Sequence, residues 1–527
     1  MGLTLGSSLP SELYDLIFLY LKSVDIIYSF FNLNDRFNNL IYPFLCGIDL
    51  SNIDEYALNK CCQTILPNIR HYIKAIKVDD KYIDTVFPLL SFSKIYPNLE
   101  SVFISKVKND GKYLSYLKLF KQLLNLKIYF DRIEDHKIVS NELCSNLFQS
   151  DCQIQTLFFS HVHVPIDLHI IQPCLSLRKL RIRLCSFDNV YVLLNNLPSI
   201  ESVNIDIPHV KCNRKPQQQE QNDIEFNYAK NLPSTLSKLK HFEFYAIFTA
   251  NYDYLELLLS HCCSHLEYLS LNLYIDQFID GGRLEKKLLS RLTKLKVFHF
   301  CIRTPVVDNT LNIDDYIQTY KSSYWITNNH SILCFNQSLR NRYYCVFSLP
   351  YVFHEFTYVT NDLVNYRSNV NDNILLYNKQ NKAKQITLHD SKVPYTLEFF
   401  QIIQKSFPRA MDLIFIVVPV RCLSDTLLNK ELIIENVICL RFFPDQLDFQ
   451  HFKRLLLMIP NVLMLCIPQR LLLDVLRNSQ DSSFQQLQSI FDRIIRVCIR
   501  RRSFEYNALN NNRIKLFFPN AQLSEWR

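Results

Sequence analysis

A short apolar motif recurs along most of this chain at nearly regular intervals. Three apolar residues follow the pattern apolar-x-x-apolar-x-apolar, as in Leu123, Leu126 and Ile128. Copies begin at Ile73, Leu99, Leu123, Ile154, Leu177, Ile200, Leu239, Leu266 and Leu295, with spacings of 26, 24, 31, 23, 23, 39, 27 and 29 residues. Weaker copies begin at Met411, Val437 and Val462. Such periods are typical of repeat proteins, in which each unit packs on its neighbours and one core does not limit the length.

The segments between these motifs have the apolar spacing of helices. Val190, Leu193, Leu194 and Leu197, for example, share one helical face. Proline, which stops helices, often stands where a predicted helix gives way to the next strand, as at Pro97, Pro198 and Pro460. One strand and one helix per repeat, stacked side by side, predict an α/β fold: a curved solenoid of the leucine-rich-repeat type.

Two stretches interrupt the repeat and suggest a division into four parts. Residues 211–223 (KCNRKPQQQEQND) are polar and rich in Gln, which predicts a mobile insertion. From residue 304 to about 384 the motif fades, and we expect degenerate repeats or a join between two solenoid halves. The predicted parts are a helical module (1–46), a first solenoid half (47–303), this join (304–384), and a second half with a C-terminal cap (385–527).

Composition excludes several classes of protein. Hydrophobic residues make up 48% and charged residues 20% of the 527, which is a globular composition. The net charge of +8 is mild for this length and does not indicate nucleic-acid binding. Six glycines argue against Gly-rich phosphate loops, and no 18-residue apolar window predicts a membrane span. The 17 cysteines form no Cys-x-x-Cys pair, which fits a reducing compartment, cytoplasmic or nuclear.

No motif for catalysis, cofactor binding or metal binding emerges. His261 and His265 flank a cysteine pair, but no second pair of ligands follows at the spacing of a zinc finger. The Gly-x-Ser-x-Gly, Walker and His-Glu-x-x-His motifs are missing from the sequence. We therefore expect no cofactor and no metal, and no pattern in the sequence favours a catalytic site.

The N-terminal segment has more apolar side chains than a small module can bury. From Leu9 to Leu45, 22 of 37 residues are apolar. Three short helices are predicted here, and in the first of them one apolar face has the spacing of a buried face: Leu13, Leu16, Ile17, Tyr20 and Leu21. Tyr14, Phe18 and Leu19 make the opposite face apolar too. The surplus must contact the rest of the chain, another protein, or both.

The same segment resembles an F-box. The resemblance rests on Leu9-Pro10-Ser11-Glu12-Leu13, then Ile17-Phe18, Tyr20-Leu21, Asp25, and residues 33–38 (LNDRFN). Many F-boxes carry Trp where this chain has Phe37, and a Val-Cys pair where it has Leu33-Asn34. Together with the repeats, the chain is similar to the F-box/leucine-rich-repeat family: a three-helix F-box followed by a solenoid.

The resemblance implies a role and a partner. F-box proteins dock on the Skp linker of a cullin-RING ubiquitin ligase and present a client to it, while the ubiquitin chemistry takes place on other subunits. By position in the motif, the anchors for the linker would be Leu9, Pro10, Leu13, Ile17, Leu21 and Phe37. Two alternatives stay open. The chain could be a ligase-independent leucine-rich-repeat scaffold whose N-terminus only caps the solenoid, or a solenoid that binds RNA or phosphate.

The motif also predicts where a client would bind. In each strand the apolar positions point inward, so the residues between them face the concave surface. Basic and aromatic residues gather at these positions: Lys127, Tyr129, Phe158, Lys179, Arg181 and Arg183. Such residues favour an acidic or phosphorylated client segment. The 211–223 insertion and the C-terminal half remain alternative client sites.

Overall fold

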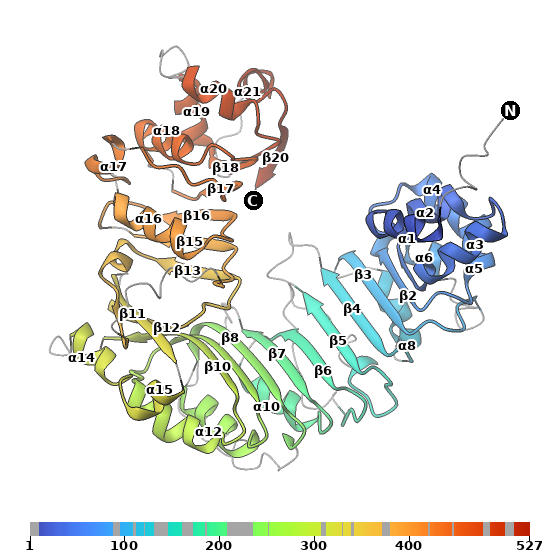
Figure 1. Ribbon diagram of the computed structural model, residues 1–527, viewed down its shortest axis with the longest axis horizontal. Helices are drawn as coiled ribbons and strands as arrows, with labels where there is room; N and C mark the ends of the chain where they lie inside the picture. Colours follow the sequence, from blue (N-terminus) through green and yellow to red (C-terminus); the bar gives the residue numbers. More distant parts are fainter. Residues whose placement is uncertain are drawn as a thin grey trace. The chain divides into compact units, whose positions relative to one another are not determined.

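The structure is a computed structural model, and the chain in it divides into two compact units. The described residues are 10–526, except 88–94, 109–111, 121, 131–145, 161–171, 185–186, 208–235, 251, 307–311, 329, 339–341, 371–379, 391, 420–421, 430, 445–446, 478–484 and 501–510. The first unit comprises Met1–Ser270 and Arg291–Val297, and the second comprises Leu271–Ser290 and Phe298–Arg527 (Figure 1). Among the described residues, no helix combines the length and apolar character needed to cross a membrane. The predicted insertion at 211–223 lies outside the described residues.

The first unit opens with three helices, α1 (Ser11–Tyr20), α2 (Ser23–Phe30) and α3 (Asp35–Ile41), followed by the 3₁₀ turn η2 (Tyr42–Cys46). The side chain of Asn34 caps α3 by accepting a hydrogen bond from the Phe37 N–H at 3.0 Å. The prediction of three short helices is therefore correct in number and place.

The buried face of α1 is the opposite of the one that the apolar spacing favoured. Tyr14 and Phe18 are buried, whereas the expected inward face, with Leu13, Leu16 and Ile17, is exposed. The two aromatic rings reach an aromatic cluster from α2 and α3: the Tyr14 and Phe37 ring centroids are 5.0 Å apart, as are those of Phe18 and Phe30. Large rings fill the space between three short helices better than Leu and Ile do. The face of α1 that carries Tyr14 and Phe18 is therefore the buried one.

Eight strands of the first unit follow one another in a parallel sheet, each paired with the next in sequence. They are β1 (Gly47–Asp49), β2 (Ala75–Asp79), β3 (Ser101–Val107), β4 (Asn125–Phe130), β5 (Thr156–Ser160), β6 (Lys179–Arg183), β7 (Ser202–Ile207) and β8 (His241–Ala250). The second and third positions of the apolar motif, such as Leu126 and Ile128, are fully buried, and the residues between them are not. The predicted alternation along each strand is confirmed.

In the described residues, short helical segments lie between β1 and β4, between β6 and β7, and after β8, where the periodicity predicted helices. They are α4 (Glu55–Lys60), the π-turn η3 (Cys61–Ile65), α5 (Leu66–Ile69), η4 (Asp80–Tyr82), α6 (Ile83–Val86), η6 (Lys112–Tyr116), α8 (Leu117–Phe120), α10 (Asp188–Asn195) and α12 (Tyr252–Cys262). Their apolar residues, such as Leu117, Phe120 and Leu194, are buried against the apolar face of the strands. The opposite face of the sheet is thereby left to the residues between the motif positions.

The second unit begins with an antiparallel arrangement that the sequence did not predict. Strands β10 (Val297–Pro305), β12 (Arg342–Leu349), β11 (Ser331–Ser338) and β14 (Arg367–Ser368) pair in that order, all antiparallel. They occupy much of the stretch where we expected degenerate repeats or a join. The other elements of this region are β9 (Tyr268–Ile275, at the division), α13 (Gly281–Arg283), η9 (Leu284–Leu288), η10 (Leu289–Arg291), α14 (Ile313–Gln318) and α15 (Ser323–Thr327).

The rest of the second unit returns to strand–helix alternation. Its described strands form a seven-stranded parallel sheet: β13 (Glu355–Val359), β15 (Gln385–His389), β16 (Asp412–Val417), β17 (Cys439–Phe442), β18 (Met464–Pro468), β19 (Arg496–Arg500) and β20 (Gln522–Trp526). The helical segments are η11 (Asn361–Asn365), α16 (Leu397–Ser406), α17 (Asp425–Asn429), α18 (Phe449–Met458), α19 (Gln469–Arg477), α20 (Gln485–Phe491) and α21 (Asn511–Phe517). One apolar core joins them, with Phe415, Leu440 and Phe452 fully buried.

Candidate functional site

An apolar stripe on α1 faces solvent. It consists of Leu13, Leu16, Ile17 and Tyr20 on α1 and of Leu21 directly after the helix, and we call these five residues the α1 stripe. Their exposed fractions are 44, 55, 42, 90 and 38%, in that order. The first four have the i, i+3, i+4, i+7 spacing of a single helical face. Solvated apolar side chains contiguous on one helix mark a surface for a partner. The apolar spacing predicted that these residues form a buried face, whereas the resemblance to an F-box placed Leu13, Ile17 and Leu21 among the contacts for a partner.

The other predicted anchors fall in different places. Pro10 is exposed and precedes the first turn of α1. Phe37 is buried, with its ring 5.5 Å from that of Phe30, so it supports the module from inside instead of facing a partner. Leu9 lies outside the described residues. The structure therefore brings Leu13, Ile17 and Leu21 together on one surface and separates Phe37 from them.

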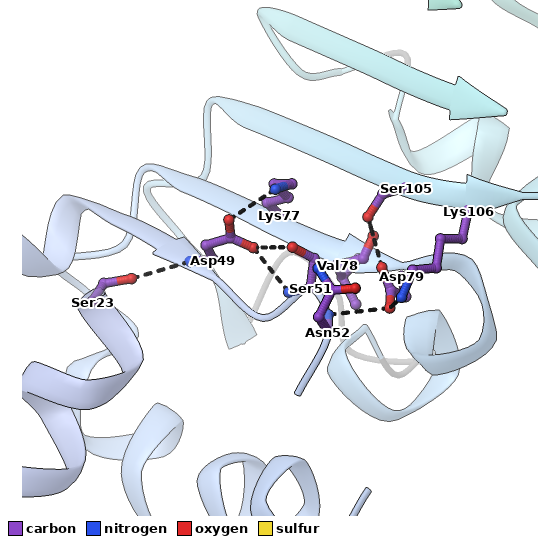
Figure 2. Close-up of polar contacts among 9 residues, drawn as sticks. All are labelled: Ser23, Asp49, Ser51, Asn52, Lys77, Val78, Asp79, Ser105 and Lys106. Carbon is purple, nitrogen blue, oxygen red and sulfur yellow. Dashed lines mark hydrogen bonds and ion pairs between the residues drawn. The ribbon is translucent and has the colours of Figure 1, made fainter. Parts of the chain in front are cut away.

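Polar contacts join the helical module to the first strands (Figure 2). The Asp49 N–H at the end of β1 donates to the Ser23 Oγ of α2 at 3.2 Å. The Asp49 carboxylate pairs with Lys77 on β2, with an Nζ–Oδ2 distance of 2.8 Å, and also accepts from Ser51. Partial burial opposes ionisation of this carboxyl, but the hydrogen bonds from Lys77 and Ser51 hold the pKa of Asp49 below its usual value.

A second polar cluster fixes the loops that follow the strands. Asp79, at the end of β2, is almost completely buried and accepts three hydrogen bonds: from Ser105 Oγ (2.7 Å), Lys106 Nζ (2.8 Å) and the Asn52 N–H (3.2 Å) (Figure 2). Asn52 and Lys106 have φ values of 60° and 54°, a left-handed conformation that few non-glycine residues adopt. A buried carboxylate with three donors offsets that strain and holds this edge of the sheet in place.

Strands β1 to β4 line an open hollow of about 620 Å³. It lies on the face of the sheet opposite the helical segments, which we call the outward face. Its lining comprises Gly47, Ile48, Asp49, Ala75, Lys77, Phe103, Ser105 and Tyr129. Tyr129 was predicted as a client contact, and Lys77 and Phe103 hold the same motif position as Lys127 in their own repeats. Asp49 was not predicted, because its strand precedes the first recognisable copy of the motif.

The strand register places cations and aromatic rings alternately in one row. Cα partners across β2 to β6 are Lys77, Phe103, Lys127, Phe158 and Arg181, which we call the outward row. The Lys127 Nζ lies 4.8 Å from the centroid of the Phe103 ring, and the Arg181 guanidinium lies 5.0 Å from that of Phe158. Each ring thus makes a cation–π contact that stabilises the position of the neighbouring cation, and the positive charge stays available to a ligand.

The predicted basic cluster is only partly available for binding. Lys179 and Arg181 are exposed on β6. Arg183 instead pairs with Asp206 on the next strand, with an Nη2–Oδ2 distance of 2.8 Å. Past Arg181 the row turns acidic at Glu243, where the hydrogen bond from His241 lowers the pKa of the carboxyl. The available positive charge therefore belongs to Lys127, Lys179 and Arg181.

No protein-family model and no curated protein matches this chain. We therefore infer its function from the two surfaces described above: the α1 stripe and the outward row with its hollow.

Proposed function

We propose that this chain is the substrate-recognition adaptor of a Skp-cullin-F-box ubiquitin ligase. The observation that carries the proposal is the α1 stripe, an exposed apolar face in a segment whose sequence resembles an F-box. Docking on the Skp linker would cover it, and an interface of standard size, about 1,200–2,000 Å², would accommodate the whole stripe. Leu9 and Pro10, which open the motif, would extend this contact.

In this proposal the strand–helix repeats are a leucine-rich-repeat solenoid that holds the client. The outward row and its hollow offer aromatic rings beside cations, which suits an acidic or phosphorylated segment. The adaptor has no catalytic step of its own. It raises the effective concentration of the client near the ubiquitin-loaded subunits, and these make the new bond.

A ligase-independent scaffold is the second candidate, because the helical module also packs on the first repeats. The Tyr28 hydroxyl donates to the carbonyl of Ala57, and the rings of Tyr42 and Tyr72 stack with centroids 4.3 Å apart. A cap of this kind explains the buried face of the module. It does not account for the exposed apolar side chains of the α1 stripe.

Replacing Leu13 and Ile17 by Glu in the full chain tests the proposal. Both side chains are exposed, so the variant should keep the melting temperature of the wild type. Two carboxylates in an apolar interface should weaken binding of a purified Skp-type linker at least about a hundredfold, measured by calorimetry or co-purification.

Leu175→Glu is the matched control, because Leu175 is 62% exposed but lies away from the module, just before β6. We expect it to bind the linker as the wild type does. If the wild type does not bind the linker, or if the double variant binds equally well, the chain is not an adaptor of this kind.

A further inference from the structure

Three cysteines lie on the face of the C-terminal parallel sheet that points away from its core. Cys439, Cys466 and Cys498 stand on β17, β18 and β19, and their strand neighbours Leu440, Leu465 and Val497 point into the apolar core. All three are free thiols. In the described part of the chain no three His, Cys, Asp or Glu side chains are arranged to hold a metal ion.

Cys466 and Cys498 are direct neighbours across two strands. They are Cα partners in the parallel pairing of β18 with β19, so their side chains leave the sheet on the same side. Adjacent strands lie about 4.8 Å apart, inside the range of roughly 4.4–6.8 Å in which the Cα atoms of a disulfide are found. Cys439 belongs to a neighbouring row, with Met464 as its partner. The register therefore favours a single disulfide, Cys466–Cys498.

The surroundings of Cys498 favour its thiolate. Arg496 and Arg500 lie two residues to either side on the same strand and are both exposed. The Ser524 Oγ lies 3.1 Å from the Cys498 Sγ. The hydrogen bond from Cys466, with help from Ser524 and Arg496, lowers the pKa of Cys498 to about 6, and the pKa of Cys466 rises in return. Reactive cysteines are found in such electropositive, partly exposed settings.

We propose that Cys498 is a peroxide-sensitive thiol and that Cys466 is its resolving partner. The thiolate sulfur of Cys498 attacks one oxygen of hydrogen peroxide, the O–O bond breaks, and an S–O bond forms. The sulfur loses two electrons, the peroxide gains them, and the hydroxide that leaves becomes water on taking a proton. The Cys466 sulfur then attacks Cys498, the S–O bond breaks, and the hydroxide leaves as water with the Cys466 thiol proton.

The first test measures thiol reactivity in the reduced full-length protein. Brief treatment with limiting iodoacetamide at neutral pH, read by peptide mass spectrometry, should alkylate Cys498 about tenfold faster than Cys439. Cys439 is a suitable reference, because it lies on the same face but is only 6% exposed, and burial raises its pKa to about 11. Equal rates at the two positions would overturn the proposal.

The second test follows the oxidation. Hydrogen peroxide should link the Cys466 and Cys498 peptides by a disulfide that dithiothreitol reverses. In Cys466→Ser the reaction should stop at a sulfenic acid on Cys498, which dimedone traps. Cys439→Ser should form the disulfide as the wild type does. The proposal fails if peroxide oxidises other cysteines of the folded protein first and leaves Cys466 and Cys498 unlinked.

The buried pair Cys152 and Cys174 of the first unit provides an internal control. The hydrogen bond from Cys152 lowers the pKa of Cys174 to about 6 as well, but Cys174 is only 1% exposed. We expect iodoacetamide to modify it more slowly than Cys498, because the reagent must reach the sulfur. Faster labelling of Cys174 than of Cys498 would contradict the assignment.

Discussion

At the scale of single residues, His299 on β10 shows how burial sets protonation. Its ring is partly buried, and this burial, helped by the nearby charges of Lys382 and His330, lowers its pKa to about 4. The imidazole of the folded protein therefore stays neutral well below the pH at which a solvated histidine takes up its proton, about 6.5.

We predict that this histidine makes stability depend on pH in mildly acidic solution. Between about pH 6.5 and pH 4 the unfolded chain binds a proton at His299 and the folded chain does not, so stability falls as the pH falls. His299→Gln cannot take up that proton, so its melting temperature should fall less than that of the wild type over this range. His261→Gln, at an exposed position, should follow the wild type; identical slopes for all three proteins would refute the prediction.

Single residues also show where sequence reasoning reached its limit. The alternation of apolar and polar residues correctly placed Lys127 and Arg181 on the outward face, because strand periodicity leaves only two sides. It could not reveal that Arg183 pairs with Asp206, since the partner comes from another repeat, 23 residues away. The resemblance to an F-box, for its part, placed Phe37 among the linker anchors, although its ring packs inside the module.

At the scale of elements, α1 has two apolar faces that do different things. Tyr14 and Phe18 hold the module together, and the α1 stripe remains in solvent. Helical periodicity alone could not tell which face is buried, because both are apolar. The number and size of aromatic rings on α2 and α3 decide it.

Two alanine substitutions next to each other in α1 should distinguish a buried side chain from an exposed one. Phe18→Ala removes a buried ring that contacts Phe30 and Phe44, and should lower the free energy of unfolding by about 3–5 kcal/mol. Leu19→Ala changes a side chain that is 70% exposed and should cost less than about 0.5 kcal/mol. Urea denaturation of the two full-length variants measures the difference; a larger loss from Leu19→Ala would mean that Leu19, and not Phe18, is the buried side chain.

The strand elements were predictable to different degrees in the two units. Where the motif repeats, each strand pairs with the next and its position follows from the sequence. Between residues 304 and 384 the chain instead makes antiparallel pairs, such as Ile332 with Ser348 on β11 and β12. These strands are buried on both faces and carry no repeated motif, so the sequence has no signal from which their pairing could be predicted. The loss of the repeat showed only where the structure changes.

At the scale of the whole molecule, the boundary between the two compact units falls where the repeat in the sequence is not interrupted. The motif copies that begin at Leu266 and Leu295 continue across the division between the two units, so composition and period stay the same there. Both proposed binding surfaces belong to the first unit, one on its helices and the other on its strands. Each can therefore be altered while the fold and the other surface are kept.

That separation leads to a prediction about the client surface. Replacing Lys127 and Arg181 by Glu reverses a partly exposed and an exposed charge of the outward row. Because the new carboxylates repel an acidic ligand, the change should weaken binding of a fluorescent oligoglutamate peptide about tenfold or more. Fluorescence anisotropy measures the affinity. Lys118→Glu makes the same kind of change on the helical side of the β4 repeat, at α8, and should keep the wild-type affinity.

Each of the two pairs of substitutions should weaken one binding activity and leave the other unchanged. Lys127→Glu with Arg181→Glu should leave binding of the Skp-type linker unchanged, and Leu13→Glu with Ile17→Glu should leave binding of the acidic peptide unchanged. Loss of both activities in either variant, at an unchanged melting temperature, would mean that the two surfaces are one site. If a single-stranded RNA displaces the peptide with a steep dependence on salt, the outward row binds polyanions through their backbone charge, and the nucleic-acid alternative replaces the protein client.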